Sequence, residues 1–192
     1  HPIDHYYPWP GQFQPLQAQR ETARFLTSHQ RAYCLSGMGT GKTMASLWSF
    51  DFLRQIGEVR RLLVVAPLST LERTWGDELF THFPHLRFNV LHGTASKRRA
   101  LLADPVDVYI INHDGVKVLE EDLKQRPDID LVIIDEVSQV ARNSQTDRWK
   151  SLRALLANRK WAWGMTGTPT PNAPTDAWAQ ARLLTPSTVP AY

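Results

Sequence analysis

Short apolar runs alternate along the chain with segments whose apolar residues recur at helical spacing. Six runs predict β-strands, at 32–35, 62–66, 88–91, 106–111, 131–134 and 162–165. Seven segments predict helices, at 17–28, 42–56, 70–80, 96–102, 116–124, 148–157 and 175–184. This alternation is typical of an α/β fold with a mainly parallel sheet and helices on both faces. We therefore expect ligands at the carboxyl edge of the sheet.

The organisation of the chain predicts one domain over residues 1–192, since no repeat, low-complexity tract or linker interrupts it. Residues 1–14 are rich in proline and aromatic residues, so we expect an irregular segment draped over the domain. Ser69 followed by Glu72 predicts a capping box at the start of the helix over 70–80.

The composition argues against membrane, secreted and disulfide-stabilised proteins. The chain has 192 residues, of which 42% are hydrophobic, enough for a substantial core. No apolar run approaches the ~20 residues of a membrane helix, and the first residues do not resemble a signal peptide, so we expect an intracellular protein without a membrane partner. A single cysteine, Cys34, excludes an intramolecular disulfide. The net charge of +3 favours polyanionic partners only mildly.

The segment 36–43, Ser-Gly-Met-Gly-Thr-Gly-Lys-Thr, predicts a phosphate-binding loop. It follows a predicted strand and opens a predicted helix, which is the context that such a loop requires. Glycines allow consecutive N–H groups to face phosphate oxygens, and the helix presents its positive end. Lys42 would lie between the β- and γ-phosphates of a nucleoside triphosphate, and the Thr43 hydroxyl would ligate Mg²⁺. Ser36 stands where the motif usually has glycine.

Two adjacent acids, Asp135 and Glu136, end the buried run 131–134. In a parallel sheet this strand end lies near the phosphate loop. Asp135 would hold Mg²⁺, and Glu136 would orient and polarise the water that attacks the γ-phosphate. An acidic pair alone also suits a solvated turn, so this assignment depends on the upstream loop.

A third segment, 163–172, closes a later strand with small hydroxyl residues and a proline-stiffened turn. Such a segment can hydrogen-bond the acidic pair on one side and a phosphodiester backbone on the other. Nucleotide state and nucleic-acid grip would then affect one another. An ordinary loop has the same residue types, so the alternative stays open.

With these residues in place, the chain resembles the first RecA-like lobe of a superfamily-two helicase, of the Swi/Snf DNA translocase type. Its ordered motifs are recognisable along nearly the whole chain, at 15–21, 37–43, 63–69 with Trp75, 91–93, 110–114, 135–136 and 166–172. The resemblance implies a RecA-like P-loop domain that binds Mg²⁺ and ATP and contacts the backbone of DNA, with RNA not excluded by backbone contacts.

The resemblance also implies site residues. Gln19 would read the adenine, with Gln17 the alternative glutamine and Phe13 a stacking partner. Lys42 and Glu136 would be catalytic, and Thr43 and Asp135 would bind the metal. The remaining nucleotide contacts would come from the loop: Gly37, Met38, Gly39, Thr40 and Gly41. The nucleic-acid contacts would come from strand ends: Ser69, Thr70, His92, Gly93, Thr94, Asn112, His113, Thr168 and Asn172.

Three details depart from the family pattern or stay open. The fourth position of the acidic motif, commonly histidine, is Ser138, which leaves open how tightly this motif couples to 166–169. Arg142 and Asn143 only approximate the Lys-Asn pair that usually follows. The basic cluster 97–99 either extends the nucleic-acid track or is a solvated helix face, and the second interpretation is slightly favoured.

Enzymes of this type use a second RecA-like lobe whose arginines complete the ATP site. The chain ends after the usual last helix of the first lobe, so we expect an excised lobe that binds ATP but hydrolyses it weakly. One alternative is a non-catalytic module whose interaction with DNA or a protein depends on nucleotide. Another, disfavoured by the ordered motifs, is a P-loop phosphotransferase. No zinc-ligand spacing or nucleophile elbow supports a different chemistry.

Overall fold

The fold is built on one six-stranded sheet, in which every strand pair is parallel. The structure is a computed structural model that describes residues 1–37, 39–170 and 172–190. The strands are β1 (Arg31–Leu35), β2 (Arg61–Ala66), β3 (Phe88–Val90), β4 (Val108–Asn112), β5 (Ile129–Asp135) and β6 (Trp161–Thr166). All six predicted strands are confirmed, because buried parallel strands give continuous apolar runs.

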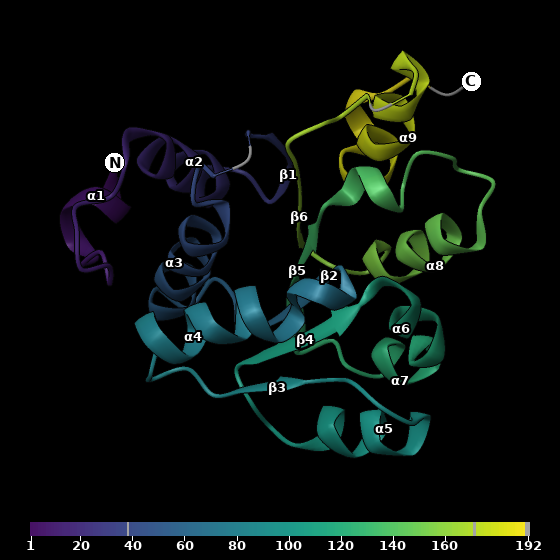
Figure 1. The fold of residues 1–192 in the computed structure, drawn as a ribbon, viewed down its shortest axis with the longest axis horizontal. Helices are drawn as coiled ribbons and strands as arrows, with labels where there is room; N and C mark the ends of the chain where they lie inside the picture. The colour runs from purple at the N-terminus through teal and green to yellow at the C-terminus, as the bar shows by residue number, and fades with distance from the viewer. Residues whose placement is uncertain (38, 171, 191–192) are drawn as a thin grey trace.

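Helices cover both faces of this sheet, as expected for the α/β class. The α-helices are α1 (Pro2–Tyr6), α2 (Gln17–Ser28), α3 (Lys42–Gln55), α4 (Asp77–His82), α5 (Ala95–Ala103), α6 (His113–Val118), α7 (Glu120–Lys124), α8 (Asp147–Leu156) and α9 (Pro174–Leu184). In Figure 1, α2 and α3 lie to the left of the sheet, and α8 and α9 lie to the right. Alternating residues of the central strands therefore feed two separate apolar cores.

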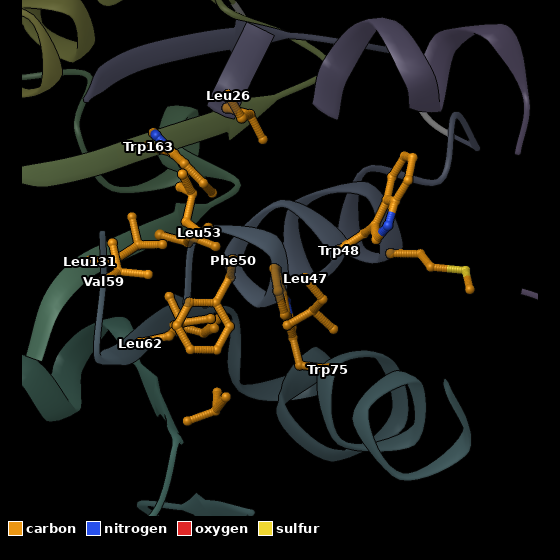
Figure 2. Packing of buried hydrophobic residues seen from close by; sticks show 14 of the residues in the cluster. Leu26, Leu47, Trp48, Phe50, Leu53, Val59, Leu62, Trp75, Leu131 and Trp163 are labelled. Atoms are coloured by element: carbon orange, nitrogen blue, oxygen red, sulfur yellow. The ribbon is translucent and has the colours of Figure 1, made fainter. Parts of the chain in front are cut away.

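The first core is centred on α3, whose residues from Met44 to Leu53 are all buried. A helix that is apolar on most sides must be covered on most sides. Figure 2 shows Phe50 and Leu53 of α3 in one cluster with Leu62 of β2 and Leu131 of β5. Because α3 directly follows the phosphate loop, this packing fixes the position of the loop against the sheet.

The N-terminal segment differs from the expectation of irregular structure over residues 1–14. Residues Pro2–Tyr6 form α1, with proline in the first turn and Ile3 fully buried. The His1 imidazole accepts the backbone N–H of Ile3 and so caps this turn. Trp9 then packs edge-to-face on Trp48 of α3, with 4.9 Å between ring centroids. The segment is held by the first core, which its composition alone did not reveal.

The connection after β2 also differs from the prediction. No side-chain capping bond forms at Ser69, so the predicted capping box is wrong. The chain instead makes a 3₁₀ turn, η1 (Leu68–Thr70), and then a π-helix, η2 (Leu71–Gly76), before α4. Pro67 starts the turn and its carbonyl accepts from the Thr70 hydroxyl, so Ser69 already lies inside a turn where it cannot act as a cap.

Three further 3₁₀ or broken segments complete the fold. They are η3 (Val137–Gln139), η4 (Pro186–Thr188) and the break at Leu119, which splits the predicted helix 116–124 into α6 and α7. The strand order is β1-β6-β5-β2-β4-β3. The carboxyl ends of all six strands lie at one edge, and β6 stands between the loop-bearing β1 and the acid-bearing β5.

Candidate nucleotide and nucleic-acid site

The phosphate loop joins β1 to α3 at the carboxyl edge of the sheet. Gly39 and Gly41 have φ values of 74° and 71°, in the left-handed region that glycine adopts without steric cost. Gly41 is the N-cap of α3, and none of the described side chains caps the helix, so its first N–H groups are open to an anion. Met38, a predicted loop contact, lies outside the described residues.

Lys42 and the loop hydroxyls are held within the loop itself. The Lys42 ammonium donates to the Ser36 carbonyl at 2.8 Å, and the Ser36 and Thr40 hydroxyls are 2.8 Å apart. Thr40 also donates to the Gly37 carbonyl at 2.9 Å. In the part of the chain that the structure describes, the Thr43 hydroxyl has no hydrogen-bond partner. The loop is thus closed on itself, with one hydroxyl left to bind a ligand.

The two acids lie in different surroundings at the end of β5. Asp135 is buried; one carboxylate oxygen accepts the Glu136 N–H at 2.9 Å and the other accepts the Trp75 indole N–H at 3.0 Å. Burial raises the pKa of Asp135, opposed by these two donors and by the charge of Lys42. The influence of Lys42 on this carboxylate agrees with the expectation that the strand end lies near the phosphate loop.

Glu136 has a strained backbone and a partly buried carboxylate. Among the described residues it is the one non-glycine residue with positive φ, at 49°. Such strain, of order 1–3 kcal/mol, is found chiefly where function requires it. Burial and the neighbouring Asp135 charge both raise the pKa of Glu136. A carboxylate whose pKa is raised toward neutrality suits a group that accepts a proton.

Thr166, at the end of β6, connects the phosphate loop to the acidic strand. Its carbonyl accepts the Ser36 N–H at 3.2 Å. Its hydroxyl lies 2.7 Å from the Ser138 hydroxyl, and both side chains are buried. The same hydroxyl accepts the Thr168 N–H at 3.2 Å. Serine at position 138 therefore still couples the acidic motif to segment 166–169, by a direct hydrogen bond.

Gln19 is the predicted glutamine that reaches the loop. It is buried near the start of α2, where its side-chain oxygen accepts the Leu16 N–H at 2.9 Å and its amide donates to the Gly41 carbonyl at 3.4 Å. One amide hydrogen and one oxygen lone pair remain for a base. Gln17 instead faces outward and donates to Glu21 at 2.7 Å. Phe13 is 79% exposed and free to stack.

The predicted nucleic-acid contacts all follow strand ends at the same edge as the loop. Exposed members are Ser69, His92, Gly93, Thr94, Thr168 and Asn172, while Thr70, Asn112 and His113 are half-buried. Ser69 and His92 line one open hollow, together with Leu68, Leu71, Glu72, Arg73 and Val90. Of the nine predicted contacts, the structure thus brings Ser69 and His92 to one hollow.

Asn112 and His113 are already engaged inside the protein. The Asn112 side-chain oxygen accepts from Arg98 at 2.9 Å, and the His113 Nε2–H donates to the Asp135 carbonyl at 3.0 Å. Burial lowers the pKa of His113, which keeps the ring neutral. These two side chains hold neighbouring strand ends in place, and His113 in particular offers no positive charge to a phosphate.

Two of the three side chains in the basic cluster 97–99 are engaged by bonds within the protein. Arg98 donates to the carbonyls of Leu91 and Gly93, each at 2.9 Å, and Arg99 pairs with Asp122 at 3.1 Å. These contacts favour neither a nucleic-acid track nor a solvated helix face. Arg98 instead stabilises the conformation of segment 91–93 by its bonds to two carbonyls of that segment. The contact between Trp75 and Asp135 could not be predicted from the sequence, because 60 positions separate the two residues.

A magnesium ion fits the oxygen donors at this edge. Among the described residues no cluster of three or more His, Cys, Asp or Glu side chains forms a closed metal cage. Mg²⁺ instead prefers one or two protein oxygens together with phosphate oxygens and waters. The Thr43 hydroxyl, which has no partner among the described residues, and the Asp135 carboxylate supply that kind of donor.

Comparison with known families gives a match to the SNF2-related domain over residues 18–190. The chain belongs to the SNF2-related domain family. Among curated relatives, protein p41 of Acyrthosiphon pisum secondary endosymbiont phage 1 is 30% identical over 178 residues, covering 88% of this chain and 38% of p41. The chromatin-remodeling ATPase INO80 of Schizosaccharomyces pombe is 29% identical over 163 residues, covering 78% of this chain and 10% of INO80.

Solved structures agree with this SNF2 assignment. The SWI2/SNF2 ATPase core of Sulfolobus solfataricus in complex with double-stranded DNA matches with a TM-score of 0.76 and 25% identity. That match covers 93% of this chain and 37% of the archaeal chain. The UvsW helicase of bacteriophage T4 shares the fold, with a TM-score of 0.66 at 13% identity. The chain is thus an SNF2-family ATPase domain in the region of the N-terminal lobe. It spans about two fifths or less of p41, INO80 and the archaeal core, and 64% of the UvsW chain.

The helices of the described residues also bear on a membrane role. Searched over residues 1–37, 39–170 and 172–190, the structure has no helix that is both long and apolar enough to cross a membrane.

Proposed function

We propose that this chain is the nucleotide-binding motor lobe of an ATP-dependent DNA translocase or helicase. In this proposal it binds ATP with Mg²⁺ and grips the backbone of DNA, which is double-stranded in the complex of the archaeal neighbour. The observation that carries the proposal is the position of Thr166, hydrogen-bonded to the phosphate loop on one side and to the acidic motif on the other. The candidate backbone contacts Thr168 and Asn172 follow it directly.

The roles of the residues follow from their surroundings. Lys42 would exchange the Ser36 carbonyl for the phosphates, and the first N–H groups of α3 would bind phosphate oxygens. Thr43 and Asp135 would hold the magnesium ion, which supplies positive charge to the β- and γ-phosphate oxygens. Glu136 would orient the attacking water and accept its proton. Gln19 would contact the base with its remaining donor and acceptor.

Full turnover would require a second RecA-like lobe in the whole protein. The relatives matched by the chain are much longer than the matched region. Positive charge delivered by an arginine to the transition state is worth ~10³–10⁵ in rate in related phosphoryl transfers. We therefore propose that this chain binds nucleotide by itself and hydrolyses it slowly.

The proposal is tested by the nucleotide affinity of Lys42→Ala, measured by titration calorimetry with Mg²⁺ and ATP. In this proposal Lys42 would make two charge-assisted hydrogen bonds to phosphate oxygens, each worth about 1.5–3 kcal/mol, so losing both should weaken binding at least ~100-fold. Lys160→Ala is the matched control, because Lys160 is an exposed lysine that pairs with Glu58 and lies over the Trp161 ring, away from the phosphate loop. Equal affinity of Lys42→Ala and the unmodified chain would refute the nucleotide site.

A second measurement separates a motor lobe from a passive interaction module. Filter binding of duplex DNA, with and without Mg²⁺ and nucleotide, should give two different affinities, because Thr166 connects the two sites. An unchanged DNA affinity would favour an interaction module in which nucleotide has no mechanical role.

A further inference from the structure

Trp75 contacts the proposed metal-binding carboxylate from an element outside the loop and the acidic motif. Its indole N–H donates to the second carboxylate oxygen of Asp135 at 3.0 Å. Trp75 is fully buried and Asp135 is 8% exposed. Since the other oxygen of Asp135 accepts the Glu136 N–H, each oxygen has one protein donor, and together the two donors fix the plane of the carboxylate.

Trp75 is carried by the π-helix η2, an uncommon element that is enriched at functional sites. Trp75 belongs to the first core together with Leu47 of α3, and Figure 2 labels both residues. Within the same π-helix, Glu72 and Arg73 are exposed and line the hollow that also contains Ser69 and His92. One short element therefore has an inward side chain on the acidic site and outward side chains on the candidate nucleic-acid surface.

We propose that Trp75 is a positioning residue that transmits the nucleic-acid state of segment 68–76 to the Asp135 carboxylate. The inference rests on the proposed function, because it assumes that Asp135 holds Mg²⁺ and that the hollow receives a phosphodiester backbone. A shift of the π-helix on backbone binding would move the indole N–H. The orientation of the carboxylate toward Mg²⁺ would change with it, without any contact between DNA and the metal.

The test uses the full chain with Trp75→Phe, which keeps an aromatic ring in the core and removes the N–H donor. Calorimetry with ADP is performed once with Mg²⁺ and once with a chelator. Groups that orient a metal ligand typically contribute 10- to 100-fold to metal affinity. We expect the Mg²⁺-dependent gain in ADP affinity to fall by about 10-fold or more, while the affinity without metal stays unchanged.

A matched control removes a comparable indole hydrogen bond elsewhere. Trp149 is buried between α8 and α9 and donates to the Ala179 carbonyl at 2.8 Å. Trp149→Phe should leave the Mg²⁺-dependent gain at its original value. If Trp75→Phe does not fold, as judged by thermal melting, β-(3-benzothienyl)alanine at position 75 keeps the volume of the ring system and replaces N–H by sulfur.

The second readout is the coupling between the two ligands. The ratio of duplex DNA affinities with and without Mg²⁺ and ADP should approach one in Trp75→Phe, while Trp149→Phe keeps the original ratio. An unchanged Mg²⁺-dependent gain and an unchanged ratio would overturn the inference, as would an equal loss in Trp149→Phe or an equal loss of metal-free affinity. If the unmodified chain bound no nucleotide, the proposed function itself would fail.

Discussion

Asp135 and Glu136 are neighbours in the chain, yet their carboxylates have opposite environments. Asp135 is buried and has a hydrogen-bond donor on each oxygen. The Glu136 carboxylate is only partly buried and accepts no hydrogen bond from the described residues. A fixed carboxylate suits a metal ligand and a free one suits a base that must move with a water. Two adjacent acids thus acquire separate proposed roles from burial and backbone geometry.

Glu136→Gln should leave nucleotide binding intact and reduce ATP turnover by the whole protein by about 10²–10⁴-fold, because the amide cannot accept the proton. The measurement is steady-state phosphate release, with ADP affinity as the internal control. Glu58→Gln, at an exposed ion pair with Lys160, should keep full turnover. Undiminished hydrolysis by Glu136→Gln would remove this residue from the proposed mechanism.

His113 should make the stability of the metal-free chain depend on pH. Its pKa is lowered in the folded state by burial and by Arg148, while the Asp135 carbonyl and Asp114 act in the opposite direction. The unfolded chain binds the proton near the ordinary value of 6.5. Burying the neutral ring therefore carries no penalty above pH 6.5. As pH falls from 6.5 through the folded pKa of His113, the unfolded chain gains a proton that the folded chain does not bind, and the free energy of unfolding falls. The total loss is about 1.4 kcal/mol for each unit by which the folded pKa lies below 6.5.

His113→Gln tests this linkage, since the glutamine amide can still donate to the Asp135 carbonyl without titrating. Urea denaturation of both proteins at pH 7.5 and at pH 5 should show a smaller loss of unfolding free energy in the variant. Replacing the exposed His29 by glutamine should preserve the original dependence. Identical pH dependence in the unmodified chain and His113→Gln would contradict a neutral, buried His113.

For single residues, the sequence was sufficient where a role depends only on neighbouring positions in the chain. The phosphate loop is contiguous, so glycine spacing and Lys42 suffice to recognise it. The contact of Trp75 is different, because its partner is 60 positions away and the register of distant elements decides which atoms meet. For Thr166, whose partner is 28 positions away, the sequence predicted a hydrogen bond between its segment and the acidic pair, but not that Ser138 would be the partner. For the same reason the engagement of His113 by Asp135 could not be anticipated from the sequence.

Among the elements, β6 gives the carboxyl edge its organisation. The apolar pattern predicted each strand, since buried parallel strands read as continuous apolar runs. Strand order is not a local property, however, and nothing in the pattern placed β6 between β1 and β5. The start of the helix over 70–80 was also missed, because a 3₁₀ turn after Pro67 and a π-helix override the capping signal of Ser69 and Glu72.

Thr166→Val should lower the unfolding free energy by about 1–3 kcal/mol, because the buried Ser138 hydroxyl and the Thr168 N–H lose their partner. Combining it with Ser138→Ala should cost less than the sum of the two single changes. Urea denaturation of the four proteins completes this cycle. Thr27→Val, at an intrahelical bond near the surface, is the control and should change stability by less than about 0.5 kcal/mol. Strict additivity would argue against a direct bond between the two hydroxyls.

At the scale of the whole molecule, the nucleotide and backbone candidates lie at the carboxyl edge of the sheet, and several ion pairs lie at the amino edge. At the amino edge, Arg60 pairs with Asp130, and Arg61 and Arg126 both pair with Asp128. These pairs tie strand starts together away from the site. Ion pairs thus brace the amino edge, while the phosphate loop and the acidic motif lie at the opposite edge of the sheet.

At this scale we expect ATP turnover by the isolated chain to be about 10³–10⁵-fold slower than turnover by the whole protein, because the second lobe would supply the completing arginines. Phosphate release by both proteins, at saturating ATP and duplex DNA, is the measurement. Equal rates would show that the SNF2 lobe described here is sufficient for catalysis.

The packing of the first residues against α3 limits where a shortened version of the protein can begin. Tyr7 donates to Asp51, a buried carboxylate that also accepts from His85 at 2.7 Å, and Trp9 shields Trp48. A shortened gene starting at Gln17, the first residue of α2, would strip both covers from the helix that carries Lys42. Poor yield or aggregation of such a product would then result from the loss of this packing and would say nothing of the nucleotide site.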